Sequence, residues 1–308
     1  MNGLKQLLPN RLRKGIAQAL GLNDIRDWLK IVDKRVQQID VRLAAMASQQ
    51  DHLMRYLESL DALVVRNVAT PDDLPLPPLK LVHLVAGSHD VDWFFKGGQA
   101  GAACIREVLQ RNGLAIENFR KILDFGSGCG RVIRYWKNLI HVEVYGSDYN
   151  PELVAWCQTN LPFAEFKKNE LQPPLSFNSG EFDFIYSLSV FTHLPEDLQT
   201  PWMQELTRVI APGGYLLLTT HGDYYMDILN EDDKGKFAAD QLVVRRSDVA
   251  GSNDCNVYHP EKYVRERLAV GFDVVDFIPR GSKGTPFQDL YLLRKSDHTS
   301  ALRASAPG

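Results

Sequence analysis

A glycine-rich turn near the middle of the chain constrains its fold more than any other feature. An apolar run, 121–125, leads into the alternating glycines Gly126, Gly128 and Gly130, and a helix-like segment follows. Glycine permits positive φ angles and lets a ligand approach the backbone closely. A helix that begins directly after the turn also presents unpaired N–H groups to a ligand. The pattern therefore predicts a strand, a tight ligand-binding turn and a helix.

An acidic residue follows the next apolar run. Residues 141–147 form that run, and Asp148 ends it. In doubly wound α/β sheets, an acid at the end of the second strand is placed to bind ribose hydroxyls. The alternative for Asp148 is a turn or helix-capping role. Together the turn and the acid predict a site for a nucleoside cofactor on a Rossmann-like sheet.

The glycine spacing distinguishes between such cofactors. The dinucleotide-binding fingerprint is G-x-G-x-x-G, and its third glycine would fall on Arg131. Asp124, two residues before the first glycine, would repel a pyrophosphate and attract a positive amino group. S-adenosylmethionine carries an α-amino group and a sulfonium but no phosphate. We therefore expect S-adenosylmethionine, and a nicotinamide-dependent dehydrogenase is the more distant alternative.

In its motifs the chain resembles the class I S-adenosylmethionine-dependent methyltransferases over roughly residues 97–295. The shared features, in the family's order, are the turn at 124–130, Asp148 with Tyr149, and the segments 163–170, 182–194 and 211–218. The resemblance implies an α/β fold with a seven-stranded, mainly parallel Rossmann-like sheet whose last strand runs antiparallel. The strands are expected near 121–125, 141–147, 163–167, 182–187, 214–220, 272–278 and 288–293.

The resemblance also implies which residues hold the cofactor. In the family, the first motif, the ribose-binding acid, the residues near the adenine and the end of the fourth strand have this role. In this sequence they are Asp124, Gly126, Ser127, Gly128, Gly130, Arg131, Asp148, Tyr149, Asn169, Glu170 and Ser187. The sequence shows no metal-binding pattern.

The catalytic residues are expected beyond the carboxyl ends of the strands, because ligands of such sheets bind there. A hydroxyl acceptor does not ionise at neutral pH and needs a base. His221 is the first candidate and His193 the second, with Tyr224 and His259 behind them. The alternative for each histidine is a structural role. The polar insertion 222–258 is expected to shape substrate recognition.

The expected reaction is methyl transfer to a small hydroxylated acceptor. Segments 258–264 and 288–291 are similar to methyltransferases of bacterial glycan and secondary-metabolite pathways, which implies O-methylation of a saccharide or similar molecule. No N/D-P-P-aromatic motif follows the fourth strand, and the net charge of -3 gives no reason to expect a nucleic-acid partner. The alternatives are a nitrogen or carboxylate acceptor, and an inactive methyltransferase-like domain that serves as a coiled-coil scaffold.

A long heptad pattern precedes the methyltransferase-like part. Twelve positions at alternating steps of four and three run from Ile25 to Val64, and eleven are apolar, with Gln50 as the exception. A strict 3.5-residue period over this length is typical of a coiled coil. We expect homo-oligomerisation through residues 25–64; the alternative is a helix that folds back on its own catalytic domain. Residues in the first half of the pattern favour a coiled coil of more than two helices, and those in the second half favour two, which leaves the number of helices open.

The remaining segments complete the expected organisation. Four cysteines without C-x-x-C spacing, no apolar run of membrane-spanning length and no secretory signal predict a cytoplasmic protein. Membrane contact by the basic residues 4–20 is the weaker alternative to a solvated helix. The expected parts are a basic segment and coiled-coil helix (1–68), a proline-rich linker (69–96) with a candidate lid at 85–95, the methyltransferase domain (97–296) and a disordered tail (297–308).

Overall fold

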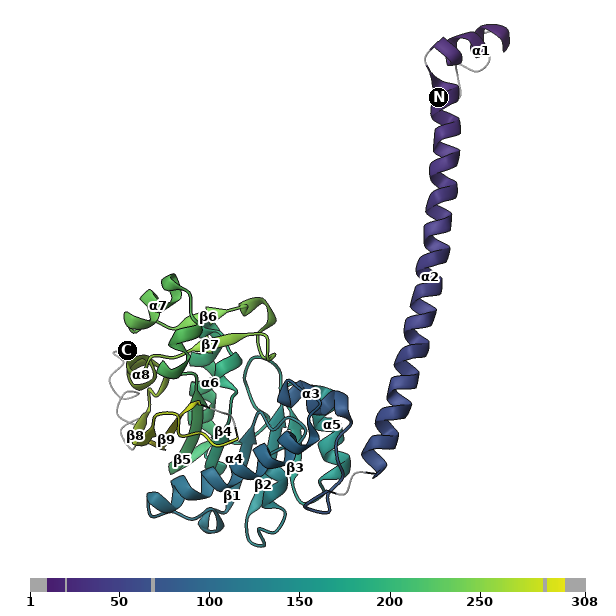
Figure 1. The fold of residues 1–308 in the computed structure, drawn as a ribbon. Helices are drawn as coiled ribbons and strands as arrows, with labels where there is room; N and C mark the ends of the chain where they lie inside the picture. The colour runs from purple at the N-terminus through teal and green to yellow at the C-terminus, as the bar shows by residue number, and fades with distance from the viewer. Residues whose placement is uncertain (1–9, 20, 68–69, 285–286, 297–308) are drawn as a thin grey trace. The chain divides into compact units, whose positions relative to one another are not determined.

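The chain folds into two compact units, residues 1–66 and 67–308. The computed structural model describes residues 10–19, 21–67, 70–284 and 287–296 (Figure 1). Most of the predicted basic segment 4–20 is described, whereas the predicted tail 297–308 lies outside the described residues. The first unit contains the helices α1 (Asn10–Ala19) and α2 (Leu22–Asn67). Helix α2 spans 46 residues and covers the whole predicted heptad region.

The second unit is built on a seven-stranded sheet, which confirms the predicted α/β fold. Its strands lie in the order β3-β2-β1-β4-β5-β9-β8. Strands β1 to β5 run parallel, and β9 is antiparallel to both of its neighbours. The strand order reverses between β1 and β4, which makes the crevice at their carboxyl ends the expected ligand site. The bounds are β1 (Lys121–Phe125), β2 (Glu143–Asp148), β3 (Glu165–Lys168), β4 (Phe182–Ser187), β5 (Ile210–Thr220), β8 (Phe272–Ile278) and β9 (Asp289–Lys295).

Helices cover both faces of this sheet. Successive side chains of a strand point to opposite faces of the sheet. In β5, Leu217 packs on one face, whereas Leu216 and Leu218 pack on the other. All three are fully buried. Because both faces are covered, the strands read as nearly continuous apolar runs. The helices on the Leu217 side are α4 (Val91–Arg111) and α5 (Pro151–Asn160). The helices on the other side are α6 (Glu196–Val209) and the short α8 (Glu261–Tyr263).

The prediction that a helix begins directly after the glycine turn is wrong. Residues 128–132 form turns, and a single 3-10 helix, Ile133–Trp136, follows. Two arginines tie this segment to other parts of the unit. Arg131 donates from Nη1 to the carbonyl oxygen of Gly284 at 2.9 Å, and the buried guanidinium of Arg134 pairs with Asp72. These contacts hold the segment in compact turns, and Ile133 and Trp136 are buried at the three-residue spacing of a 3-10 helix.

The segment before the sheet also differs from the expectation. Helix α3 (Leu79–Ala86) occupies part of the predicted linker, and α4 begins at Val91 rather than at Gly97. The earlier start has a local cause, because Asp90 caps α4. Its side chain accepts a hydrogen bond from the backbone N–H of Trp93 at 3.0 Å.

The insertion 222–258 forms a small substructure. It has a core of its own, made of Leu229, Phe237, Val243 and Tyr258. This core accounts for the ordered backbone of a segment whose composition is mostly polar. Its elements are the 3-10 helix Asp223–Ile228, α7 (Glu231–Ala238) and the antiparallel strands β6 (Val243–Arg245) and β7 (Asn256–Tyr258).

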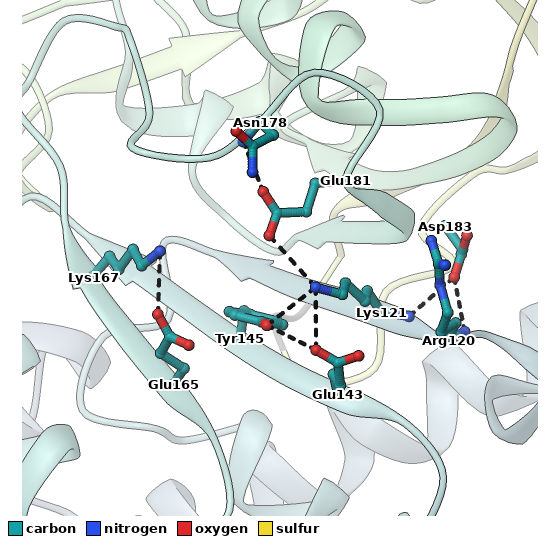
Figure 2. Close-up of polar contacts among 9 residues, drawn as sticks. All are labelled: Arg120, Lys121, Glu143, Tyr145, Glu165, Lys167, Asn178, Glu181 and Asp183. Carbon is teal, nitrogen blue, oxygen red and sulfur yellow. Dashed lines mark hydrogen bonds and ion pairs between the residues drawn. The ribbon is translucent and has the colours of Figure 1, made fainter.

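A network of charged and polar groups fastens the amino ends of the strands (Figure 2). Lys121 Nζ, at the start of β1, lies 3.1 Å from Glu143 Oε2 and 3.6 Å from Glu181 Oε1. Asp183 accepts hydrogen bonds from the backbone N–H groups of Arg120 (2.8 Å) and Lys121 (3.0 Å). These contacts join β1, β2 and β4 at the edge opposite to the carboxyl ends.

The cysteines Cys104, Cys129, Cys157 and Cys255 are free and buried. Within the described ranges, no helix has the length and apolar character needed to cross a membrane. The same ranges contain no cluster of three or more histidine, cysteine or acidic side chains that could hold a metal ion.

Candidate cofactor and acceptor site

A cavity of about 760 Å³ lies at the carboxyl ends of β1 to β4. Its walls come from the glycine turn after β1 and from the residues that follow β2, β3 and β4. Two segments distant in sequence, 83–87 and 251–254, also line it. The cavity therefore lies at the point where the strand order reverses, as expected for a ligand site of such a sheet.

The glycine turn has the backbone conformation that its sequence predicts. Gly126 and Gly128 take positive φ angles of 81° and 56°. A Cβ atom on Gly126 would lie 2.2 Å from Val190 Cγ2, and one on Gly128 would lie 2.6 Å from Val85 Cγ2. Glycine is therefore required at both positions, and both line the cavity with bare backbone.

Asp148 lines the cavity and also holds the turn. Its Oδ2 accepts a hydrogen bond from the backbone N–H of Gly128, and its Oδ1 accepts one from that of Asn150, both at 2.9 Å. Burial raises the pKa of this carboxyl, and the backbone hydrogen bonds oppose the rise. The turn role is thus present in the structure. Ribose binding by the same carboxylate stays a prediction.

Asp124 has a carboxyl that ionises near neutral pH. Its side chain is buried and lines the cavity. Burial raises its pKa to about 7; the Tyr186 hydroxyl opposes the rise, the charge of Asp148 adds to it, and Arg131 opposes it. A positive ligand group in the cavity would stabilise the ionised form. This carboxyl is therefore suited to bind an ammonium group.

Two buried polar atoms of the cavity wall, Ser127 Oγ and Asn169 Oδ1, have no hydrogen-bond partner among the described residues. Asn169 donates from Nδ2 to the carbonyl oxygen of Glu170 at 2.8 Å, which leaves its side-chain oxygen as a free acceptor. Buried polar atoms are usually hydrogen-bonded, so these two atoms are positions where a molecule in the cavity can form hydrogen bonds with the wall. The hydroxyl and amino groups of an adenosyl moiety would satisfy them. The residues present therefore fit S-adenosylmethionine.

His193 lies on the cavity wall with a defined tautomer. Its Nδ1 lies 2.7 Å from the carbonyl oxygen of Cys255. Because a carbonyl oxygen only accepts, Nδ1 carries the proton and Nε2 keeps its lone pair. Burial lowers the pKa of this imidazole. The neutral form, which can accept a proton at Nε2, therefore predominates at neutral pH.

His221, the first candidate base from the sequence, is not among the residues that line the cavity, and it is buried. Its Nδ1 lies 3.2 Å from the carbonyl oxygen of Val257, and its Nε2 lies 3.4 Å from Gln288 Nε2. Burial lowers its pKa to about 4, and the nearby His193 adds to this shift. Both ring nitrogens of His221 contact protein groups, which favours the structural alternative for this residue.

A ring of hydrogen bonds beside the cavity contains Gln288, a residue that the sequence analysis did not assign to the site. Ser189, at a φ of 62°, donates its backbone N–H to Thr219 Oγ1 at 2.8 Å. Thr219 Oγ1 donates to Gln288 Oε1 at 2.7 Å, and Gln288 Nε2 donates to Ser189 Oγ at 2.8 Å. Ser189 and Gln288 line the cavity. The sequence could have indicated Gln288 through the antiparallel last strand that it predicts, because pairing of that strand with β5 brings position 288 to the carboxyl end of β5.

Two segments that flank the cavity are joined to each other. Residues 85–87 and Trp93 of the predicted lid line the cavity. Asn253, in the insertion, donates from Nδ2 to the carbonyl oxygen of Leu84 at 2.9 Å. The insertion and the end of α3 therefore meet beside the site. Closure of either segment on a ligand stays a prediction.

Most of the predicted site residues meet in this cavity, and four do not line it. Gly130 faces the core, where an added Cβ would lie 2.4 Å from Leu161 Cδ1, and Ser187 is fully buried. Tyr224 stacks on Phe287 with ring centroids 4.2 Å apart. His221 is the fourth. His259, a further candidate for the catalytic base, is buried and does not line the cavity either. Those that line it are Asp124, Gly126, Ser127, Gly128, Arg131, Asp148, Tyr149, Asn169, Glu170 and His193.

The sheet order and the cavity agree with the methyltransferase fold that the sequence motifs predict. Residues 123–218, from the first strand to the fifth, match the family described as methyltransferase domain. The match covers about a third of the chain and identifies a methyltransferase domain within it.

Curated relatives contain a similar region. Tocopherol O-methyltransferase of Arabidopsis thaliana is 29% identical over 133 residues, which cover 40% of this chain and 37% of the relative. Malonyl-[acyl-carrier protein] O-methyltransferase of Enterobacter lignolyticus is 30% identical over 108 residues, which cover 35% of this chain and 41% of the relative. A solved S-adenosylmethionine-dependent methyltransferase of Mesorhizobium loti aligns at 14% identity with a TM-score of 0.48, covering 62% of this chain and 98% of that one. The chain thus matches well under half the length of these curated relatives.

Proposed function

We propose that the protein transfers a methyl group from S-adenosylmethionine to a hydroxyl group of a small acceptor. The observation that carries this proposal is the imidazole of His193, a proton acceptor on the wall of the cavity that also contains the glycine turn and Asp148. The two curated relatives described above are both named as O-methyltransferases, which agrees with an oxygen acceptor.

The cofactor would be held by side chains at the ends of the first three strands. Asp124 would bind the α-amino group, because a buried carboxylate gains most from a positive partner. Asp148 would accept hydrogen bonds from the ribose hydroxyls, and Asn169 Oδ1 would accept one from the adenine amino group. The sulfonium supplies an activated methyl group and its own leaving group. The protein therefore contributes position and removal of the acceptor's proton.

The acceptor hydroxyl would bind on the side of the cavity lined by His193, Ser189 and Gln288. Nε2 of His193 would take the hydroxyl proton as the new bond to oxygen forms. The carbonyl oxygen of Cys255, which already accepts the Nδ1–H bond, would stabilise the resulting imidazolium. Because burial keeps the free imidazole neutral, the base needs no prior loss of a proton.

A saccharide or a similar small polar molecule is our first choice of acceptor. Ser189, Ser252, Asn253, Asp254 and Gln288 all line the cavity and can hydrogen bond to several hydroxyl groups. Nitrogen and carboxylate acceptors are the alternatives, and an inactive scaffold is the alternative from another class of protein.

Titration calorimetry with S-adenosylmethionine and S-adenosylhomocysteine, beside NAD as a control, tests the first part of the proposal. We expect binding of the first two and none of NAD. Methyl transfer is then measured from labelled cofactor to sugars, phenols, amines and carboxylates. Transfer to hydroxyl compounds supports the proposal. Transfer to amines or carboxylates alone would overturn the hydroxyl assignment, and binding without any transfer would favour the scaffold.

The substitution His193→Asn tests the base directly. Asparagine keeps a donor near the position of Nδ1 for the Cys255 carbonyl but offers no basic nitrogen. We expect kcat to fall by about 10²- to 10⁴-fold, the usual contribution of a general base, with little change in cofactor affinity. The matched variant His221→Asn should retain more activity, because His221 does not line the cavity. A larger loss in His221→Asn than in His193→Asn would reverse the assignment.

A further inference from the structure

Helix α2 carries an exposed apolar stripe along one of its sides. The stripe consists of the a and d positions of the heptad pattern between Ile25 and Val64, and we call these positions the seam. Six apolar residues of the seam with described side chains are between 40% and 64% exposed. They recur at steps of three and four or their sums, so they lie along one side of the helix. An exposed apolar stripe of this length marks an interaction surface. The six are Val36, Ile39, Leu43, Met46, Leu53 and Leu60.

The heptad positions of these residues define how a second helix would meet the first. Steps of four and three from Ile25 place Ile25, Val32 and Ile39 at position d, and Leu29, Val36 and Leu43 at position a. Knobs at a and d insert into holes formed by four residues of a facing helix, which must carry a compatible heptad repeat. A second copy of α2 carries it by definition, which makes it a matched occupant of the whole seam.

Gln50 distinguishes between the two directions in which two such helices can pack. In a parallel, in-register pair, the a position of one helix faces the same a position of the other. Gln50 then meets the second copy's Gln50, and the two amides can hydrogen bond to each other. In an antiparallel pair with matched ends, Gln50 would face the second copy's Ile39, and its amide would be buried without a partner. Such burial costs free energy.

The charged flanks agree with the parallel direction. Arg35 is at position g and Asp40 at the following position e, and both side chains are exposed. In a parallel pair, g and the next e of the other helix are neighbours across the seam. Arg35 therefore lies beside the second copy's Asp40, and the pair occurs twice in a dimer. The antiparallel arrangement offers a comparable pair between Arg26 and Asp61 but leaves Gln50 against Ile39, so Gln50 decides between the directions.

We propose that α2 joins copies of this protein into a parallel, in-register homo-oligomer. The seam residues form its core, Gln50 fixes the register, and each catalytic unit then follows the same end of the coil. The proposal does not depend on methyl transfer. Its competitor is a helix whose seam folds back on the catalytic unit of the same chain.

Light scattering after size-exclusion chromatography of the full chain is the first test. A single copy has a mass of 34.8 kDa, and we expect a mass of at least twice this value. Leu43→Lys should raise the dissociation constant at least about tenfold, because it places a charge in the seam. Val41→Lys is the matched control: Val41 is also exposed, two residues away, but it lies at position f outside the seam. Far-UV circular dichroism of both variants checks that the helix is retained.

Single cysteines test direction and register. Val36→Cys and Leu53→Cys are made in separate full-length proteins and oxidised alone and as a mixture; the four native cysteines are buried. A parallel, in-register coil predicts that each variant crosslinks to itself. A link between positions 36 and 53 is not expected, because 17 residues separate them by about 25 Å along a helix. An antiparallel coil with matched ends predicts the reverse, with crosslinks only in the mixture.

Three results would overturn the proposal. One is a monomeric mass for the full chain at every concentration, which would favour the folded-back helix. Another is equal dissociation of the Leu43→Lys and Val41→Lys variants, which would show that the seam is not the interface. The third is crosslinking confined to the mixture of cysteine variants, which would show an antiparallel arrangement.

Discussion

At the scale of single residues, the carboxylate of Asp148 accepts hydrogen bonds from two backbone N–H groups and also lines the cavity. The variant Asp148→Asn keeps the shape of the side chain but removes its charge and one acceptor oxygen. We expect cofactor binding to weaken by about 1–3 kcal/mol, the usual loss for a hydrogen bond to a charged group. Titration calorimetry with S-adenosylmethionine measures this change.

The control for this variant must separate binding from stability, because Asp148 also holds Gly128 and Asn150. Asp183→Asn is suited to this purpose. Asp183 likewise accepts two backbone N–H groups, but it lies at the amino ends of the strands (Figure 2). Both variants should lose stability, and only Asp148→Asn should lose affinity. Equal affinities for the two variants would contradict the ribose assignment.

The acidity of Asp124 predicts a pH dependence of cofactor binding. Burial raises the pKa of its carboxyl to about 7 in the free protein, so the group is neutral below this pH and negative above it. A positive α-amino group binds the negative form, and protonation below pH 7 must therefore oppose binding. Affinity should fall as the pH decreases from 7.0 to 5.5, by up to about tenfold per pH unit.

Calorimetry across this interval tests the pH prediction. The α-amino group of the cofactor stays protonated there, since α-amino groups titrate at about 7.7–8.0. In Asp124→Asn, affinity should be lower and nearly constant with pH. A dependence of equal slope in that variant would assign the titration to another group, such as Asp148, whose pKa is also raised by burial.

At the scale of elements, α4 packs so closely against the end of the glycine turn that Gly98 has no room for a Cβ atom. A Cβ on Gly98 would lie 2.0 Å from the carbonyl oxygen of Arg131. Gly98→Ala should therefore destabilise the protein by about 1–3 kcal/mol through overpacking, although alanine favours helices. Gly235→Ala, in α7, meets nothing within 4 Å and should stabilise by about 0.5–1 kcal/mol. Urea unfolding measures both variants, and a stabilised Gly98→Ala protein would contradict the close packing.

The elements also show what the sequence could predict. The first two strands were predicted because their apolar runs end at a glycine turn and at Asp148, whereas the later strands were predicted from the family resemblance. The helix after the glycine turn was predicted wrongly, because the contacts of Arg134 with Asp72 join residues 62 positions apart. Local patterns contain no information on such pairs.

The same limit applies to the candidate base. Both histidines end up near the carboxyl edge of the sheet, as their positions after β4 and β5 predicted. What separates them is tertiary: the Cys255 carbonyl, from the insertion, sets the tautomer of His193, while Val257 and Gln288 engage His221. The conformation of an insertion determines such contacts, and its sequence has no regular period from which to infer it.

At the scale of the whole molecule, the chain separates into a helical unit, 1–66, and a catalytic unit, 67–308. All residues that line the described cavity belong to the catalytic unit. Assembly through α2 should therefore bring sites together without completing them. This leads to a prediction about variants that do not assemble.

The seam variant Leu43→Lys should bind S-adenosylmethionine with a dissociation constant within about twofold of the unmodified chain. The physical reason is that a charge in the seam alters contacts between copies, whereas Asp124, Asp148 and His193 keep their partners within one catalytic unit. Calorimetry at a concentration where the variant is monomeric measures this, with Val41→Lys as the assembled control. A loss of affinity in Leu43→Lys alone would show that a second copy contributes to the site. The scale at which the cofactor site is complete would then be the oligomer rather than the single catalytic unit.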